Sequence, residues 1–249
     1  MGVDCCLILE FKLDDWVVLK NIFTNINEII DEVIVECTFD GLNFKGIDRG
    51  HICFFEGSIS KELFDKYELE DYLSLYLDLY ELVKILKRGN NKDSLVFKAD
   101  MEVIKIVFEN KNNRTFSLTQ LDMSNDNMRA LPTLEYSVEF ECDFDTIKNS
   151  LKDADLYSNI LEIICEDNLL IFNCEGQNGN YKNECPLDNS FNGSYSAKYS
   201  IDWLFKIFNT KLNSNDFKIH MGTDYPMLIE MGFEYVKMNY LLAPRLGED

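Results

Sequence analysis

An internal repeat constrains the fold of this 249-residue chain more than any single motif does. The same pattern of helix, turn, strand, turn and strand occurs at residues 78–109 and again at residues 200–231. In the first copy, the apolar residues that recur at the spacing of a buried helix face are Leu79, Leu82, Val83 and Leu86. Gly89 then ends the helix, and alternating apolar residues predict strands at 95–97 and 103–108.

The second copy follows the first at a constant distance along the chain. Lys206 lies 122 residues after Lys84, and the residues on either side match at the same shift. The apolar stripe of its helix is formed by Ile201, Leu204, Phe205 and Phe208. A second pair of segments matches at a shift of 128 residues, which is the distance along the chain from Trp16 to Phe144. Because constant shifts mark a repeated structural unit, the chain is predicted to hold two similar domains, each with two helices and many short strands.

The other elements of the two domains follow from the same periodicities. The buried stripe of a helix predicted at 14–27 is Trp16, Leu19, Phe23 and Ile26. The stripe of a helix predicted to end near residue 157 is Phe144, Ile147 and Leu151. Strands are predicted at 33–39, 42–47, 51–58, 68–79, 161–166 and 169–174. Asp40-Gly41 joins the first two of these strands in a tight hairpin turn.

A polar segment separates the two domains. Residues 117–136 show neither helical nor strand periodicity over any length and contain Pro132 near their end. We therefore predict an N-terminal domain at 1–117, an inter-domain connector at 118–136 and a C-terminal domain at 137–249. Residues 177–194 form a second polar region, which is predicted to be a loop or the edge of a sheet.

The net charge of −20 argues against a protein that attracts nucleic acid over its whole surface, because phosphates require positive charge. The few basic residues are segregated, however, since Lys84, Lys87 and Arg88 form a separate face of one predicted helix. No apolar run approaches the roughly 20 residues that span a bilayer. The N-terminus lacks a signal-peptide pattern, and the eight cysteines lack disulfide or zinc spacing, so an intracellular, reducing compartment is expected.

Known catalytic motifs are absent from the sequence. It contains no phosphate-binding glycine loop, no dinucleotide fingerprint and no nucleophile elbow. The two histidines, His51 and His220, lie 169 residues apart, and an isolated histidine in a strand is more often structural than catalytic. The sequence therefore favours a binding or scaffolding protein that is not an enzyme and holds neither a metal nor a cofactor.

Short motifs occur in a fixed order along nearly the whole chain. They are Asp40-Gly41-Leu42, residues 47–52, Leu121-Asp122-Met123, residues 223–230 and the Leu-Ala-Pro-Arg at 242–245. Together with the repeat, these motifs resemble those of the DNA sliding-clamp family, proliferating cell nuclear antigen (PCNA). The resemblance implies an α+β fold of two similar domains, with helices lining the inside and sheets forming the outside of a ring of three chains. It implies a DNA polymerase processivity factor rather than an enzyme.

The resemblance further implies three kinds of partner. Duplex DNA passes through the ring without its sequence being read. DNA polymerase, the clamp loader and other replication and repair proteins dock a short PCNA-interacting peptide in a pocket. Further copies of the chain, as a homotrimer, or related clamp subunits complete the ring, and no membrane is involved. The protein is expected in the nucleus if its source is eukaryotic and in the cytoplasm if its source is archaeal.

The same resemblance assigns individual residues to three surfaces. The residues implied to contact DNA are Lys20, Lys84, Lys87, Arg88, Lys148, Lys152, Lys206 and Lys211. The residues implied to line the peptide pocket are Ile47, His51, Leu121, Met128, Leu131, Pro226, Ala243 and Pro244. The residues implied at the subunit interface, on edge strands near 114–119 and 179–185, are Arg114, Thr115, Phe116, Tyr181 and Lys182.

Two alternatives remain open at this point. The first helix departs from the family pattern, because its predicted non-core positions are Val17, Val18, Asn21 and Asn25 rather than lysines. Exposed valines at these positions suit a specialised subunit of a heterotrimer or a checkpoint-type clamp. An alternative from a different class is a small-molecule enzyme on an unrelated α+β fold, for which the sequence offers no motif.

Overall fold

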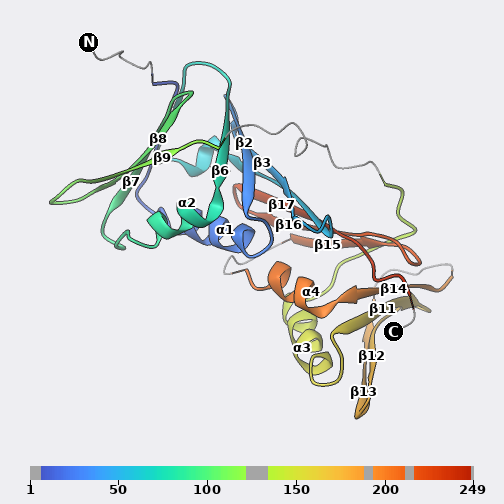
Figure 1. Cartoon of the computed structure of the whole chain (residues 1–249). Coiled ribbons are helices and arrows are strands. Elements are labelled where there is room, and N and C mark those ends of the chain that lie inside the picture. Colours follow the sequence, from blue (N-terminus) through green and yellow to red (C-terminus); the bar gives the residue numbers. More distant parts are fainter. Residues whose placement is uncertain (1–6, 122–133, 188–192, 211–215, 248–249) are drawn as a thin grey trace. The chain divides into compact units, whose positions relative to one another are not determined.

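The chain divides into two compact units (Figure 1). The computed structural model describes residues 7–121, 134–187, 193–210 and 216–247. Unit 1 consists of residues 1–48, 55–129 and 233–237, and unit 2 consists of residues 49–54, 130–232 and 238–249. Strands β4 (Cys53–Ser60) and β17 (Val236–Leu242) contribute residues to both units.

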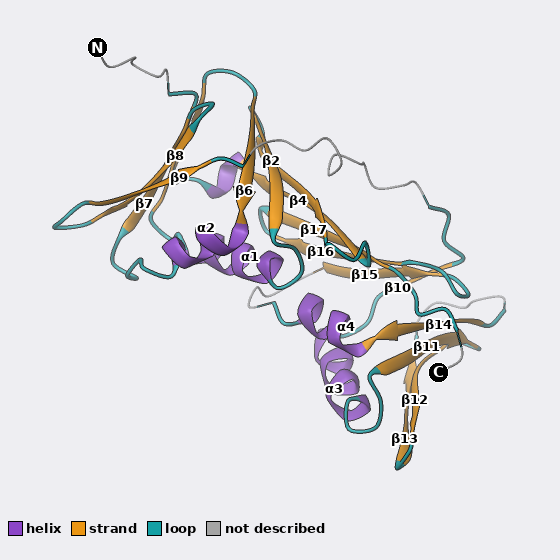
Figure 2. Cartoon of the chain, viewed as in Figure 1, coloured by secondary structure: helices purple, strands orange, loops and turns teal. Residues whose placement is uncertain are grey.

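Unit 1 contains two neighbouring helices and two sets of paired strands (Figure 2). The helices are α1 (Val17–Asn27) and α2 (Leu79–Leu86), and a short 3-10 helix spans Lys61–Leu63. One sheet has the order β5-β1-β7-β8-β9, and the other set has the order β4-β3-β2-β6. The remaining strands of this unit are β1 (Leu9–Leu13), β2 (Glu32–Thr38), β3 (Gly41–Ile47), β5 (Lys66–Leu69), β6 (Leu73–Asp78), β7 (Ser94–Ala99), β8 (Val103–Glu109) and β9 (Arg114–Thr119).

Unit 2 repeats this plan with helices α3 (Phe144–Ala154) and α4 (Ile201–Phe208). One sheet has the order β13-β12-β11-β14, and a second set has the order β10-β15-β16-β17. Its strands are β10 (Val138–Phe140), β11 (Ile160–Glu166), β12 (Leu169–Gly176), β13 (Gly179–Pro186), β14 (Tyr195–Ser200), β15 (Asp216–Met221) and β16 (Met227–Phe233). All the paired strands for which a register is recorded run antiparallel, as in the match of Ile219 to Ile229 between β15 and β16.

The repeat predicted from the sequence is present in the structure. Helix α4 begins 122 residues after α2, and β15 begins 122 residues after β7. Helices α2 and α3 begin at capping residues, because the carboxylate of Asp78 accepts from the backbone N–H of Glu81 and that of Asp143 accepts from Thr146. The predicted stripe of α2 is buried in full. Local sequence therefore sets where the repeated helices start and which face they bury.

Several element predictions are corrected by the structure. The single strand predicted at 68–79 is two strands, of which β5 pairs with β1 and β6 pairs with β2 in a different sheet. The chain leaves the first sheet at the exposed residues 70–72 before it joins the second. The buried stripe predicted for α4 included Phe205, but Phe205 is only half-buried and Ile207 is buried instead. The strand predicted at 51–58 begins at Cys53, since His51 has a φ of +56° and lies outside it.

The structure also defines two further segments, the end of α3 and the polar region at 177–194. Helix α3 ends at Ala154, three residues before the position predicted from the sequence. The polar region at 177–194 contains β13, which pairs with β12 and ends its sheet. The predicted edge of a sheet is therefore present, because strand pairing satisfies backbone groups whatever the polarity of the side chains.

Candidate functional site

A basic surface of unit 1 lies on α2 and the turn that follows it. Lys84, Lys87 and Arg88 are exposed, while Leu82 and Leu86 on the opposite face of the helix are buried. Gly89 lies three residues after the end of the helix, and a Cβ atom there would lie 2.4 Å from the ring of Trp16. A glycine is therefore required where this end of the helix packs on the core.

The carboxyl end of α2 is fixed to the edge strand β9. The Arg114 guanidinium donates to the backbone oxygen of Arg88 at 2.9 Å and pairs with the carboxylate of Asp93 at 2.5 Å. Asp93 is only 4% exposed and also accepts from the backbone N–H of Asn90 and the side chain of Asn110. These hydrogen bonds, chiefly that from the backbone N–H of Asn90, hold the pKa of Asp93 below its usual value. These contacts thus link the basic end of α2 to strand β9.

Each of the helices α1 to α4 carries a lysine whose ammonium group lies over an aromatic ring one turn away. The pairs are Lys20 over Trp16 at 5.3 Å, Lys84 over Tyr80 at 5.8 Å, Lys148 over Phe144 at 4.7 Å and Lys206 over Trp203 at 4.3 Å from the ring centroid. Such cation–π contacts hold a long side chain near the helix surface. Trp16 and Phe144 were predicted only as members of buried stripes, and none of the four rings was paired with its lysine, although the spacing of three or four residues was a usable signal.

The remaining residues predicted to contact DNA differ in exposure and in pairing. Lys152 is exposed on α3, and Lys211 lies outside the described residues. Lys84 also pairs with Glu81 at 3.2 Å, so part of its charge is already compensated. On α1 the structure corrects the prediction of exposed non-core positions, because Asn25 is buried and Val17 and Val18 are half-buried.

Unit 2 brings together part of the predicted peptide pocket. The backbone N–H of Ala243 donates to the oxygen of Ile52 at 2.8 Å, which places the Ala243-Pro244 segment beside the turn that contains His51. The next backbone N–H, of Arg245, donates to Lys198 on β14 at 2.7 Å. His51 is exposed in this turn, and its positive φ keeps it out of the strand that follows.

The other predicted pocket residues lie elsewhere or are not described. Pro226 is half-buried in unit 2 and follows Tyr225, whose backbone oxygen accepts from the hydroxyl of Tyr199 at 2.7 Å. Ile47 and Leu121 are half-buried in unit 1, and Leu121 donates its backbone N–H to Tyr76 on β6 at 3.0 Å. Met128 and Leu131 lie outside the described residues.

The residues predicted at the subunit interface lie on strands that end their sheets. Arg114, Thr115 and Phe116 belong to β9, and Tyr181 and Lys182 belong to β13. Strand β13 is held to α3 by a hydrogen bond of 3.0 Å from the Asn183 amide to the Ser150 hydroxyl. A strand at the end of a sheet presents unpaired backbone groups that another chain can extend.

The second histidine, His220, contacts side chains on two neighbouring strands. The two ring nitrogens of His220 on β15 lie 2.8 Å from Glu230 on β16 and 3.4 Å from Glu139 on β10, so the side chain joins three strands. Within the described part of the chain, no three His, Cys, Asp or Glu side chains are grouped so that they could hold a metal ion. Nor does any helix in those parts have the length and apolar character needed to cross a membrane.

Comparison with known proteins gives a consistent result. Residues 8–129 match the family model for the N-terminal domain of proliferating cell nuclear antigen. The DNA polymerase sliding clamp of Methanothermobacter thermautotrophicus is 28% identical over 241 residues, which cover 96% of this chain and 98% of that protein. The DNA polymerase sliding clamp 1 of Sulfolobus acidocaldarius is 26% identical over 96% of this chain and 100% of its own.

Solved structures show the same fold. The crystal structure of PCNA from Thermococcus kodakaraensis has a TM-score of 0.85 at 21% identity and covers 95% of this chain and all of that one. The PCNA of A. fulgidus, solved with the C-terminal region of FEN-1 bound, also has a TM-score of 0.85 at 20% identity, over 97% of this chain. The two-domain α+β clamp fold predicted from the sequence is thereby confirmed. The chain belongs to the PCNA family of DNA sliding clamps.

Proposed function

We propose that this protein is a DNA polymerase sliding clamp, which encircles duplex DNA and tethers polymerase and other replication and repair proteins without being an enzyme itself. The observation that carries the proposal is the lysine on the non-core side of each helix from α1 to α4. These cations are segregated on helices in a chain of net charge −20. The full-length similarity to proteins named DNA polymerase sliding clamps supports the same function.

The proposed mechanism is topological. A closed ring stays on DNA because it surrounds the duplex, so its phosphate contacts need only be weak and independent of sequence. The residues proposed to make these contacts are Lys20, Lys84, Lys87, Arg88, Lys148, Lys152, Lys206 and Lys211. The many acidic residues elsewhere repel DNA from the rest of the surface and so favour its passage through the ring.

The ring is proposed to form from three copies through the edge strands. Strand β9 of one copy extends the sheet that ends in β13 of the next, and repetition of this head-to-tail contact closes the ring. We keep the division into domains at 1–117 and 137–249 with a connector at 118–136. Strand β9 ends at Thr119, two residues inside the proposed connector, and the next described strand, β10, begins at Val138.

Client proteins are proposed to dock a short peptide with aromatic anchors into a pocket. Its lining is proposed to include Ile47, His51, Leu121, Met128, Leu131, Pro226, Ala243 and Pro244. An extended peptide gains affinity from backbone hydrogen bonds and from anchors that fill apolar recesses. The A. fulgidus PCNA solved with the C-terminal region of FEN-1 supports peptide capture of this kind. Because the curated relatives are archaeal, the cytoplasm is the proposed location.

A second candidate is a specialised subunit of a heterotrimeric clamp, and α1 favours it. The half-buried side chains of this helix include Val17 and Val18, and Lys20 is the basic residue among its described positions. A helix with one lysine contributes less to DNA contact than α2 does, so this chain would then share the ring with more basic partners.

Two measurements test the proposal. Light scattering of the purified protein is expected to give a mass near three times 29.0 kDa. After loading onto nicked circular DNA, the protein is expected to stay bound until a restriction enzyme linearises the circle, because a ring then slides off the free end. Release from the intact circle would refute the clamp function. A persistent monomer that forms a stable ring only with other clamp subunits would favour the second candidate.

A further inference from the structure

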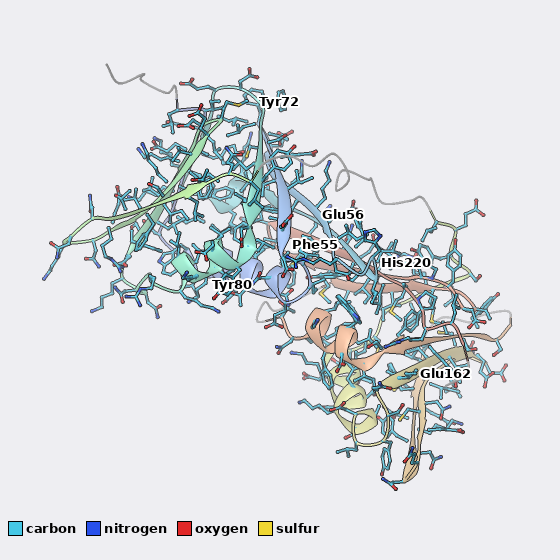
Figure 3. All side chains as sticks on the ribbon, viewed as in Figure 1. Phe55, Glu56, Tyr72, Tyr80, Glu162 and His220 are labelled. Carbon is cyan, nitrogen blue, oxygen red and sulfur yellow. The ribbon has the colours of Figure 1, made fainter. Side chains whose placement is uncertain are left out.

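Tyr80 on α2 is exposed to an unusual degree for an aromatic residue in a helix (Figure 3). Its relative exposure is 63%, and in the described part of the chain it is the one exposed aromatic residue that lies within a helix. The phenol is not needed for the core, since the buried face of α2 consists of aliphatic residues. An exposed aromatic side chain on a helix surface suggests a ligand that stacks on it.

Cations lie on the carboxyl-terminal side of Tyr80. The ammonium group of Lys84 lies 5.8 Å from the ring centroid, and Lys87 and Arg88 are exposed in the following turn. Glu81 is the acidic neighbour on this helix, and it pairs with Lys84 at 3.2 Å. These three cations lie on the carboxyl-terminal side of Tyr80, whereas Asp78, which caps the start of α2, and the neighbouring Asp31 and Glu32 lie on its amino-terminal side.

Two other exposed aromatic residues of unit 1, Phe39 and Tyr72, lie in a different environment. The rings of Phe39 and Tyr72 pack against each other at 5.1 Å in an edge-to-face geometry, so each covers part of the other. Tyr80 contacts a cation instead. An aromatic face beside cations is the combination by which proteins bind single-stranded nucleic acid, because each nucleotide offers a base to stack and a phosphate to neutralise.

We propose that Tyr80, Lys84, Lys87 and Arg88 form a binding site for unpaired nucleotides of single-stranded DNA. The base stacks on the Tyr80 ring, and the neighbouring phosphates contact the three cations. In a duplex the bases are stacked on one another, so Tyr80 has no face to engage and only the cations act. The site deepens the proposed clamp function and rests on it for its role, since it would hold the unpaired strand beside a primer end or at a gap.

Unit 2 carries a second arrangement of the same kind on α4. The ammonium group of Lys206 lies 4.3 Å from the ring centroid of Trp203, which is half-buried. The chain has two tryptophans, and the other, Trp16, is fully buried. Quenching of tryptophan fluorescence by added bases therefore reports on Trp203.

The test compares two ligands with equal numbers of phosphates: a labelled oligo(dT) and an abasic oligomer of the same length. Fluorescence anisotropy of the full chain at low salt is expected to show oligo(dT) binding about 5- to 150-fold more tightly, the range for one stacked base. Tyr80→Leu is expected to remove most of this preference. The matched control is Tyr72→Leu, since Tyr72 is 67% exposed on the same unit and lies outside the cationic face.

The outcomes separate this inference from the clamp function. Equal affinity for the two oligomers, or a preference that survives Tyr80→Leu, would overturn the single-strand site while leaving retention on circular duplex DNA as it is. Loss of the preference in Tyr80→Leu alone supports the site, provided that circular dichroism shows the same thermal unfolding for both variants. Oligo(dT) is also expected to quench Trp203, and an unchanged emission would show that the arrangement on α4 does not bind a base.

Discussion

Replacing Lys84, Lys87 and Arg88 with alanine is expected to weaken the binding of duplex DNA and to reduce its dependence on salt. All three side chains are exposed, Lys84 on α2 and Lys87 and Arg88 in the turn that follows it, and the buried face of this helix is not touched by the change. Alanine also has the highest helix propensity, so α2 is expected to persist. The effect on DNA should therefore be electrostatic rather than a consequence of unfolding.

The magnitude follows from counterion release. Each phosphate contact adds about 0.9 to the slope of the logarithm of the binding constant against the logarithm of salt concentration. Because Lys84 already pairs with Glu81, the variant is expected to lose between two and three effective contacts per chain. The slope should then fall by about 1.8 to 2.7, which weakens binding about 60- to 500-fold at 0.1 M salt and hardly at all near 1 M.

The assay is fluorescence anisotropy with a short duplex at several salt concentrations, together with retention on nicked circular DNA. A matched variant replaces Lys105, Lys198 and Lys237, three exposed lysines on the strands β8, β14 and β17. Both variants lose three positive charges and change the net charge from −20 to −23. The control therefore has the same long-range repulsion of DNA but an intact α2.

Equal losses in the two variants would show that net charge alone governs DNA binding, and the assignment of α2 to the DNA-facing surface would be wrong. The same conclusion would follow if the α2 variant kept the salt slope of the wild type. A loss confined to the α2 variant supports the proposed surface.

Three further outcomes are expected. Gly176→Ala should destabilise unit 2 by about 1–3 kcal/mol or more in calorimetry, because its Cβ would lie 1.9 Å from the backbone oxygen of Tyr157; Gly222→Ala, whose nearest contact is 3.4 Å, is the tolerated control. Hydrogen bonds from Lys66 and Lys98 hold the pKa of Glu10 below its ordinary 4.5, so the stability that Glu10 contributes is present above pH 4.5 and is lost as the pH falls through the lowered pKa. Glu10→Gln should therefore flatten the fall in the free energy of unfolding at acid pH. An unaltered fall would assign it to other groups. Leu131→Asp should weaken capture of a client peptide in calorimetric titration while the mass in solution stays the same, and unchanged affinity would move the pocket elsewhere.

Much of the local structure could be predicted from the sequence, because it depends on neighbours along the chain. The stripe of α2 and the hairpin at Asp40-Gly41 follow from helical spacing and from a turn dipeptide, whereas the helix itself ends at Leu86, ahead of the stop predicted at Gly89. The same reasoning applied to both halves gave the repeat, which the equal spacing of α2 and α4 bears out.

The errors arose where a residue's environment is supplied by distant segments. The alternation of residues 68–79 is that of a strand throughout, but the partners of its two parts belong to different sheets. Asn25 is polar and occupies a position predicted to be exposed, yet the packing of unit 1 buries it. Periodicity identifies a strand or a helix but does not identify its partner.

The candidate site shows the same division. The placement of lysines on the non-core faces of the repeated helices follows from the chain's own residue pattern, since helical spacing fixes which side chains share a face. The attachment of the end of α2 to β9 through Arg114 and the buried Asp93 arises only in the folded protein, because these contacts join residues that lie 26 and 21 positions apart along the chain. Such contacts depend on burial and on the meeting of elements far apart in the chain, which no local pattern records.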